Sequence, residues 1–61
     1  MSQTERQIAG NQRRTLRSIR QKLLGMAQEW DGVDQFNLTQ LTELADQAER
    51  VAAEMVADDS P

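Results

Sequence analysis

Apolar residues recur at alternating steps of three and four along two long stretches of this chain, and that spacing constrains the fold more than any other feature. The residues are Leu16, Ile19, Leu23, Met26 and Trp30 in the first stretch and Leu41, Leu44, Ala48, Val51 and Met55 in the second. Such steps place side chains on one face of an α-helix, whereas a strand alternates every second residue. The pattern predicts two amphipathic helices, and these ten residues are called the apolar stripe below.

The segment between the two stretches, DGVDQFN at 31–37, predicts a turn. Gly32 suits the left-handed conformation that follows a helix end, and Asn37 with Gln40 has the spacing of a helix N-cap. Helices joined by so short a connection are antiparallel neighbours. The sequence therefore predicts an all-α fold: a single domain, 1–61, that forms an antiparallel two-helix hairpin.

The helix ends are predicted from capping residues. Ser2 and Glu5 have capping-box spacing for the first helix, while Asn11 offers a later start behind Gly10. The expected ranges are about 4–30 for helix 1, 31–37 for the loop, about 38–57 for helix 2 and 58–61 for a loose tail.

A chain of 61 residues is too short to stabilise a hairpin without further contacts. Ordering about 50 residues costs on the order of 75 kcal/mol at roughly 1.5 kcal/mol each, and one helix pair buries little apolar surface. We expect the stripes of the two helices to face each other, with Leu23 beside Leu44 and Leu16 beside Val51. We also expect a second copy to pack on them, so that a homodimer forms a four-helix bundle with the apolar stripe as its oligomer interface.

Positive charge is concentrated in the first half of the chain. Residues 1–28 hold six cations and one acid, a net +5, whereas residues 29–61 hold nine acids and one arginine, a net −8. On a helical wheel four arginines form an edge roughly 110° from the centre of the stripe. The candidate binding residues on and beside this arginine edge are Arg6, Arg13, Arg14, Arg17, Arg20 and Lys22.

Two interpretations of the arginine edge remain open. In the first, the edge meets the acids Asp46, Glu49 and Glu54 of helix 2 and sets the orientation of the helices. In the second, it tracks nucleic-acid phosphates. The first is favoured because the acids are numerous and no aromatic residue interleaves the arginines for base stacking. The sequence thus predicts a small non-enzymatic interaction or regulatory module, with an RNA- or DNA-binding regulator as the alternative.

The composition argues against catalysis. The chain has no histidine, cysteine or tyrosine, so carboxylates and one lysine are the available acid and base groups. We expect no catalytic residue, metal ligand, cofactor or small-molecule substrate. No stretch approaches the roughly 20 apolar residues that span a bilayer, and a cytoplasmic protein is expected. Trp30, the single tryptophan, is expected to close the core at the loop end or, if exposed, to anchor a protein partner.

Several short segments resemble the Rop family of plasmid copy-number regulators. They are RTLRS at 14–18, Leu23 with Leu24, and EWDGVDQ at 29–35, and the chain shares the length and mid-chain turn of that family. Rop proteins are two-helix hairpins that dimerise into four-helix bundles, so the resemblance implies this fold and assembly.

The resemblance does not extend to the RNA-binding residues of the family, which are an aromatic, an asparagine, a glutamine and lysines on helix 1. In the register set by EWDGVDQ these positions hold, in turn, Thr15, Asn11, Ile19, and for the lysines Thr4 and Met26. Only the asparagine matches, so the resemblance implies the fold rather than RNA binding. The same register places Arg13 and Arg20 in core layers, whereas periodicity places neither residue in the apolar stripe.

Overall fold

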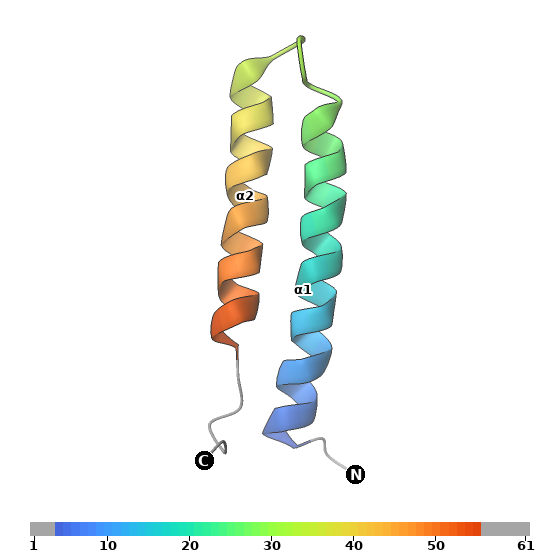
Figure 1. The fold of residues 1–61 in the computed structure, drawn as a ribbon, viewed down its shortest axis with the longest axis vertical. Coiled ribbons are helices and arrows are strands. Elements are labelled where there is room, and N and C mark those ends of the chain that lie inside the picture. Colours follow the sequence, from blue (N-terminus) through green and yellow to red (C-terminus); the bar gives the residue numbers. More distant parts are fainter. Residues whose placement is uncertain (1–3, 56–61) are drawn as a thin grey trace.

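The chain folds into two antiparallel helices joined by a short turn (Figure 1). A computed structural model describes residues 4–55, in which α1 spans Glu5–Gln28 and α2 spans Gln35–Glu54. The two helices lie side by side along their length, and residues 4–55 contain no strand. The predicted all-α antiparallel hairpin is confirmed.

A reciprocal capping box begins α1, two residues later than the predicted Ser2 cap. The backbone N–H of Gln7 donates to Thr4 Oγ1 at 3.2 Å, and the backbone N–H of Thr4 donates to Gln7 Oε1 at 3.0 Å. Two amide groups that a helix start leaves unpaired are thereby satisfied. Ser2 itself lies outside the described residues. The helix ends at Gln28, two residues before the predicted end.

The turn after α1 is held by backbone hydrogen bonds. The amides of Val33 and Asp34 both donate to the carbonyl of Trp30, at 2.9 and 3.0 Å. Gly32 has φ of 78°, the left-handed conformation predicted for it, and it is the one positive φ in the described part of the chain. Residues with a Cβ adopt this conformation at a cost, so glycine is the favoured residue here.

Asp34, rather than Asn37, caps α2. Its Oδ1 accepts hydrogen bonds from the backbone amides of Phe36 at 3.0 Å and Asn37 at 3.3 Å. The Asn37 side chain donates to Asp34 Oδ2 at 3.2 Å, so Asn37 supports the cap as a helical residue. The predicted start at 38 is therefore wrong by three residues. The helix ends at Glu54, before the predicted 57, and the predicted tail 58–61 lies outside the described residues.

Alanines form the core of the hairpin. Four residues are buried, namely Ala9, Ala27, Ala45 and Ala52, and no large side chain is fully buried among the described residues. The two halves of the apolar stripe face each other in part: Leu16 and Val51 line one hollow, as predicted, whereas Ile19, Met26, Leu44 and Val51 remain 40–50% exposed. The fully covered residues of the helix contact are small, which allows the helices to approach closely.

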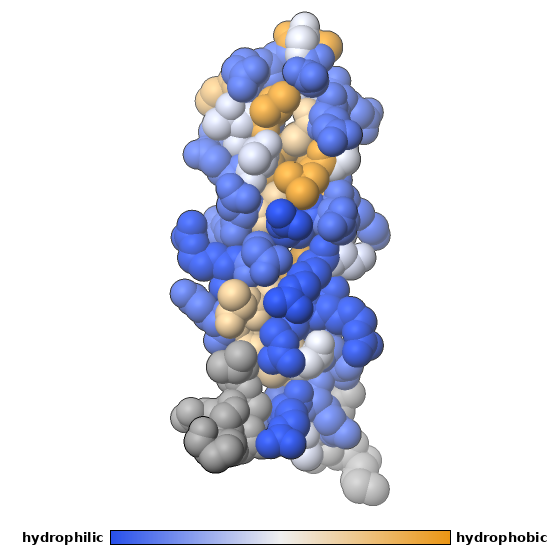
Figure 2. Space-filling view, viewed as in Figure 1, coloured by the Kyte–Doolittle hydropathy of each residue, from blue (hydrophilic) through white to orange (hydrophobic). Residues whose placement is uncertain are grey.

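Two interactions between the helices fix their register. Arg17 Nε lies 3.8 Å from Glu49 Oε1, and Arg13 Nη1 donates to the carbonyl of Met55 at 2.7 Å. Covered residues recur every seven positions on each helix and are called the inner rows: Arg13, Arg20 and Ala27 on α1, and Leu38, Ala45 and Ala52 on α2. One broad face of the hairpin is mostly hydrophilic, and its hydrophobic residues gather toward the loop end (Figure 2).

Candidate self-association surface

The apolar stripe lies on the hairpin surface, beside the contact between the helices. Its bulkiest members are partly exposed: Ile19 by 41%, Met26 by 48%, Trp30 by 37%, Leu44 by 50% and Val51 by 40%. The remaining members are half-buried, namely Leu16, Leu23, Leu41, Ala48 and Met55. The ten residues predicted for an oligomer interface therefore lie where a second body can reach them.

Both helices contribute to this surface. In antiparallel helices, residues that precede the inner row by one position lie on the same side of the pair. On α1 these are Ile19 and Met26, and on α2 they are Leu44 and Val51. The exposed bulky residues thus form one surface that crosses from helix to helix.

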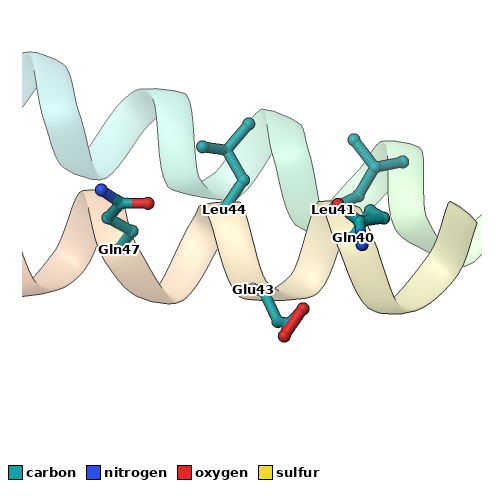
Figure 3. Close-up of a pocket in the computed structure, with 5 residues that line it drawn as sticks. All are labelled: Gln40, Leu41, Glu43, Leu44 and Gln47. Carbon is teal, nitrogen blue, oxygen red and sulfur yellow. The ribbon is translucent and has the colours of Figure 1, made fainter.

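Shallow hollows follow the stripe along the molecule. One near the open end is lined by residues from both helices, including Leu16, Val51 and Met55. Another, on α2, is lined by Gln40, Leu41, Glu43, Leu44 and Gln47. Figure 3 shows Leu41 and Leu44 turned toward the side of α1, while Glu43 points away from it. Apolar hollows of this kind receive the protruding side chains of another helix.

The border of the surface is polar and carries little net charge. Gln40 and Gln47 flank the leucines of α2, while Lys22 and Glu29 lie on the equivalent outer positions of α1. One cation and one anion on the same border favour association of like copies, because a border of one sign would repel its own copy. Interfaces between proteins share this arrangement of an apolar centre with a polar rim.

Two residues of the arginine edge contact α2. Arg13 is half-buried and donates to the Met55 carbonyl at the C-terminal end of α2, which has no basic residue in its last turn. Arg17 pairs with Glu49, one of the three acids predicted as partners. Both groups are partly exposed, so this pair contributes roughly 0–1 kcal/mol. Arg13 and Arg17 are thus engaged within the hairpin.

The other cations differ in their surroundings. Arg20 is half-buried, and its Nε is the one buried side-chain nitrogen or oxygen in the described part of the chain that has no hydrogen-bond partner. Arg14 and Lys22 are exposed. Arg6 is also exposed and takes part in an interaction. Arg13 and Arg20 are both half-buried, although neither belongs to the apolar stripe predicted by periodicity.

Exposed apolar residues surround the loop, and sequence reasoning missed one of them, Val33. Val33 and Phe36 are 73% and 68% exposed, and Val33 lines a hollow with Met26, Glu29 and Trp30. Their spacing does not continue the stripe, so periodicity gave no signal for Val33. Phe36 is an apolar residue in the first turn of α2, and its side chain is largely exposed to solvent.

Other kinds of site find no support in residues 4–55. This part of the chain contains no group of three or more acidic, cysteine or histidine residues placed to hold a metal ion. Neither described helix is long and apolar enough to cross a membrane. Comparison with protein-family models, with curated proteins and with solved structures finds no match.

Proposed function

We propose that this chain is a small non-enzymatic interaction module that works as a self-associating hairpin, two copies of which form a four-helix bundle. The observation that carries the proposal is the partly exposed apolar stripe on a hairpin whose own core consists of alanines. Burying the apolar stripe away from water would stabilise the protein. The same stripe on a second copy can cover it, as in a four-helix bundle.

The size of the surface suits a dimer. A helix of 24 residues is about 36 Å long, and two helices side by side are about 20 Å wide, so the face offers roughly 700 Å². Stable interfaces bury about 800 Å² on each partner. The hairpin face is therefore close to the area that a stable dimer needs.

The geometry favours this function over nucleic-acid binding. Arg13 and Arg17 donate to or pair with groups on α2, so they are less available to phosphates than a free basic face would be. Affinity for nucleic acid depends on the number of phosphates neutralised, and each engaged arginine lowers that number. The regulatory role of the module would then be exerted through protein contacts, with assembly as the controlled step.

Sedimentation equilibrium of the full chain tests the proposal. We expect a mass of twice the 6.9 kDa of one chain at high concentration and a melting temperature that rises with concentration. Ile19→Glu should shift the protein to monomer because it places a charge in the apolar surface. Ser18→Glu is the matched control, since it changes the charge equally at an exposed neighbour and should leave the dimer intact. A wild-type monomer with a concentration-independent transition would refute the proposal.

A further inference from the structure

A hollow at the loop end of the hairpin is lined mainly by apolar side chains. Its lining residues are Met26, Glu29, Trp30 and Val33, which come from the end of α1 and from the turn. The three apolar members are all exposed, Met26 by 48%, Trp30 by 37% and Val33 by 73%. An exposed apolar surface with a charged residue at its border is typical of a site that binds another protein. We call this surface the loop-end hollow.

Val33 extends the loop-end hollow beyond the surface proposed for self-association. Met26 and Trp30 belong to the apolar stripe, whereas Val33 lies in the turn and outside the stripe. Its backbone amide donates to the carbonyl of Trp30 at 2.9 Å, which holds Val33 against the end of α1. The turn therefore presents an apolar side chain to solvent at a defined place.

The surroundings of the loop-end hollow are negatively charged. Glu29 lines it, and Asp31 and Asp34 follow in the turn. The cation that precedes them, Lys22, lies roughly 10 Å from Glu29 along the helix axis, which exceeds the Debye length of about 8 Å at physiological salt. The next cation in the sequence is Arg50. The loop end therefore attracts positive charge.

The ends of the two helices add to this negative field unequally. A helix carries partial positive charge at its N-terminus and partial negative charge at its C-terminus. The carboxylate of Asp34 accepts hydrogen bonds from two amides at the start of α2, so the positive end of α2 already has an anion. The last turn of α1, which ends at Gln28, contains no basic residue. The negative end of α1 is therefore available to a cation of another molecule.

We infer that the loop-end hollow binds a positively charged amphipathic helix of another protein. An apolar side chain of that helix enters the hollow, while its lysines or arginines lie beside Glu29 and the end of α1. Amphipathic helices that place apolar side chains in a groove are a common mode of recognition. The loop end of a second copy does not fit, because two acidic ends repel each other. Nucleic acids and anionic membranes are repelled for the same reason.

The fluorescence of Trp30 gives the experiment its signal. Trp30 is the single tryptophan of the chain and lines the hollow, so a helix that enters should shift its emission to shorter wavelength. The probe is a synthetic helix of about four turns, built from leucine on one face and lysine on the other. We expect a saturable shift with one peptide per chain, and an affinity that falls as salt is raised. A peptide with glutamate in place of lysine should bind at least about tenfold more weakly.

Two pairs of variants locate the binding site. Glu29→Gln should raise the dissociation constant about threefold. Glu43→Gln removes the same charge from an exposed residue that points away from α1, and should change it less than about 1.5-fold. Val33→Ser should raise it at least about fivefold, whereas Phe36→Ser alters a similarly exposed residue that does not line the hollow and should change it less than about twofold. All four side chains are exposed, so circular dichroism should show an unchanged fold.

Equal effects within either pair of variants would overturn the inference, because binding would then follow general charge or exposed apolar surface. A wild-type mass above that of a dimer, abolished by Glu29→Gln, would also overturn it, since the hollow would then hold another copy. Sedimentation with saturating peptide separates the inference from the proposed self-association. A dimer that the peptide dissociates would place the peptide on the apolar stripe and contradict the inference. A monomeric wild type that binds one peptide per chain would refute self-association and support the inference.

Discussion

Leu44→Ala gives the most direct measure of what the apolar stripe contributes to assembly. Leu44 lies in α2 and is 50% exposed, so about half of its surface is available to a second copy. Burying a whole leucine side chain is worth about 1.5–3 kcal/mol. The available half is then worth about 1 kcal/mol in each copy.

Symmetry doubles this contribution, because a two-fold dimer contains the same contact twice. A loss of about 2 kcal/mol corresponds to a roughly 30-fold rise in the dissociation constant. Alanine has a higher helix propensity than leucine, so α2 itself is not weakened by the change. Sedimentation equilibrium over a range of concentrations measures the dissociation constant directly.

Phe36→Ala serves as the control for Leu44→Ala. Phe36 is 68% exposed and larger than leucine, but it lies at the first turn of α2 away from the stripe. Its removal should change the dissociation constant less than about threefold, since it would remain in solvent in the dimer. Equal effects of the two substitutions would mean that exposure alone, and not membership of the stripe, governs association.

Four further variants test the local structure and the arginines. Asp34→Ala should lower the free energy of unfolding by about 0.5–2 kcal/mol, because two amides of α2 lose their acceptor. Gly25→Ala should raise the free energy of unfolding by about 1 kcal/mol, because a Cβ at Gly25 meets open space in a helix. Gly32→Ala should lower the free energy of unfolding, because φ of Gly32 is positive. Urea denaturation measures both changes. The double variant Arg13→Gln with Arg17→Gln should lower the free energy of unfolding by about 1–3 kcal/mol, and this loss should be smaller at high salt. Neither the wild type nor this double variant should bind structured RNA in a titration. Salt-sensitive, micromolar binding by the wild type that the double variant loses would favour the nucleic-acid function instead.

The features of the fold that depend on residues close together in the sequence were predictable. Helical spacing in both halves and Gly32 at the turn predict a hairpin, and the structure has one. The choice of cap was harder to predict, because Asp34 and Asn37 are both good N-cap residues three positions apart. The earlier cap adds a helical turn with its hydrogen bonds, and Asn37 still bonds to Asp34 from within the helix.

The side of each helix that meets the other was not predictable from periodicity. An apolar stripe shows which face leaves water, but it does not show whether the second helix of the chain or another molecule covers that face. Ala45 and Ala52 directly follow Leu44 and Val51 of the stripe in the sequence, yet they are the fully buried residues of α2. Small residues let the two backbones approach closely. Whether they do so depends on the facing residues of both helices, so it cannot be predicted from the sequence of either helix alone.

The arginines show the same limit. A helical wheel correctly separates them from the apolar stripe, but an angle of roughly 110° is compatible with solvent, with α2 or with nucleic acid. The structure resolves this for Arg13 and Arg17, whose partners on α2 are Met55 and Glu49. A long arginine side chain can reach across the helix contact because the fully buried residues of α2 are alanines, which keep the two backbones close. The arginines of the first half and the alanines of the second therefore both belong to the contact between the helices, while the bulkiest residues of the apolar stripe stay partly exposed.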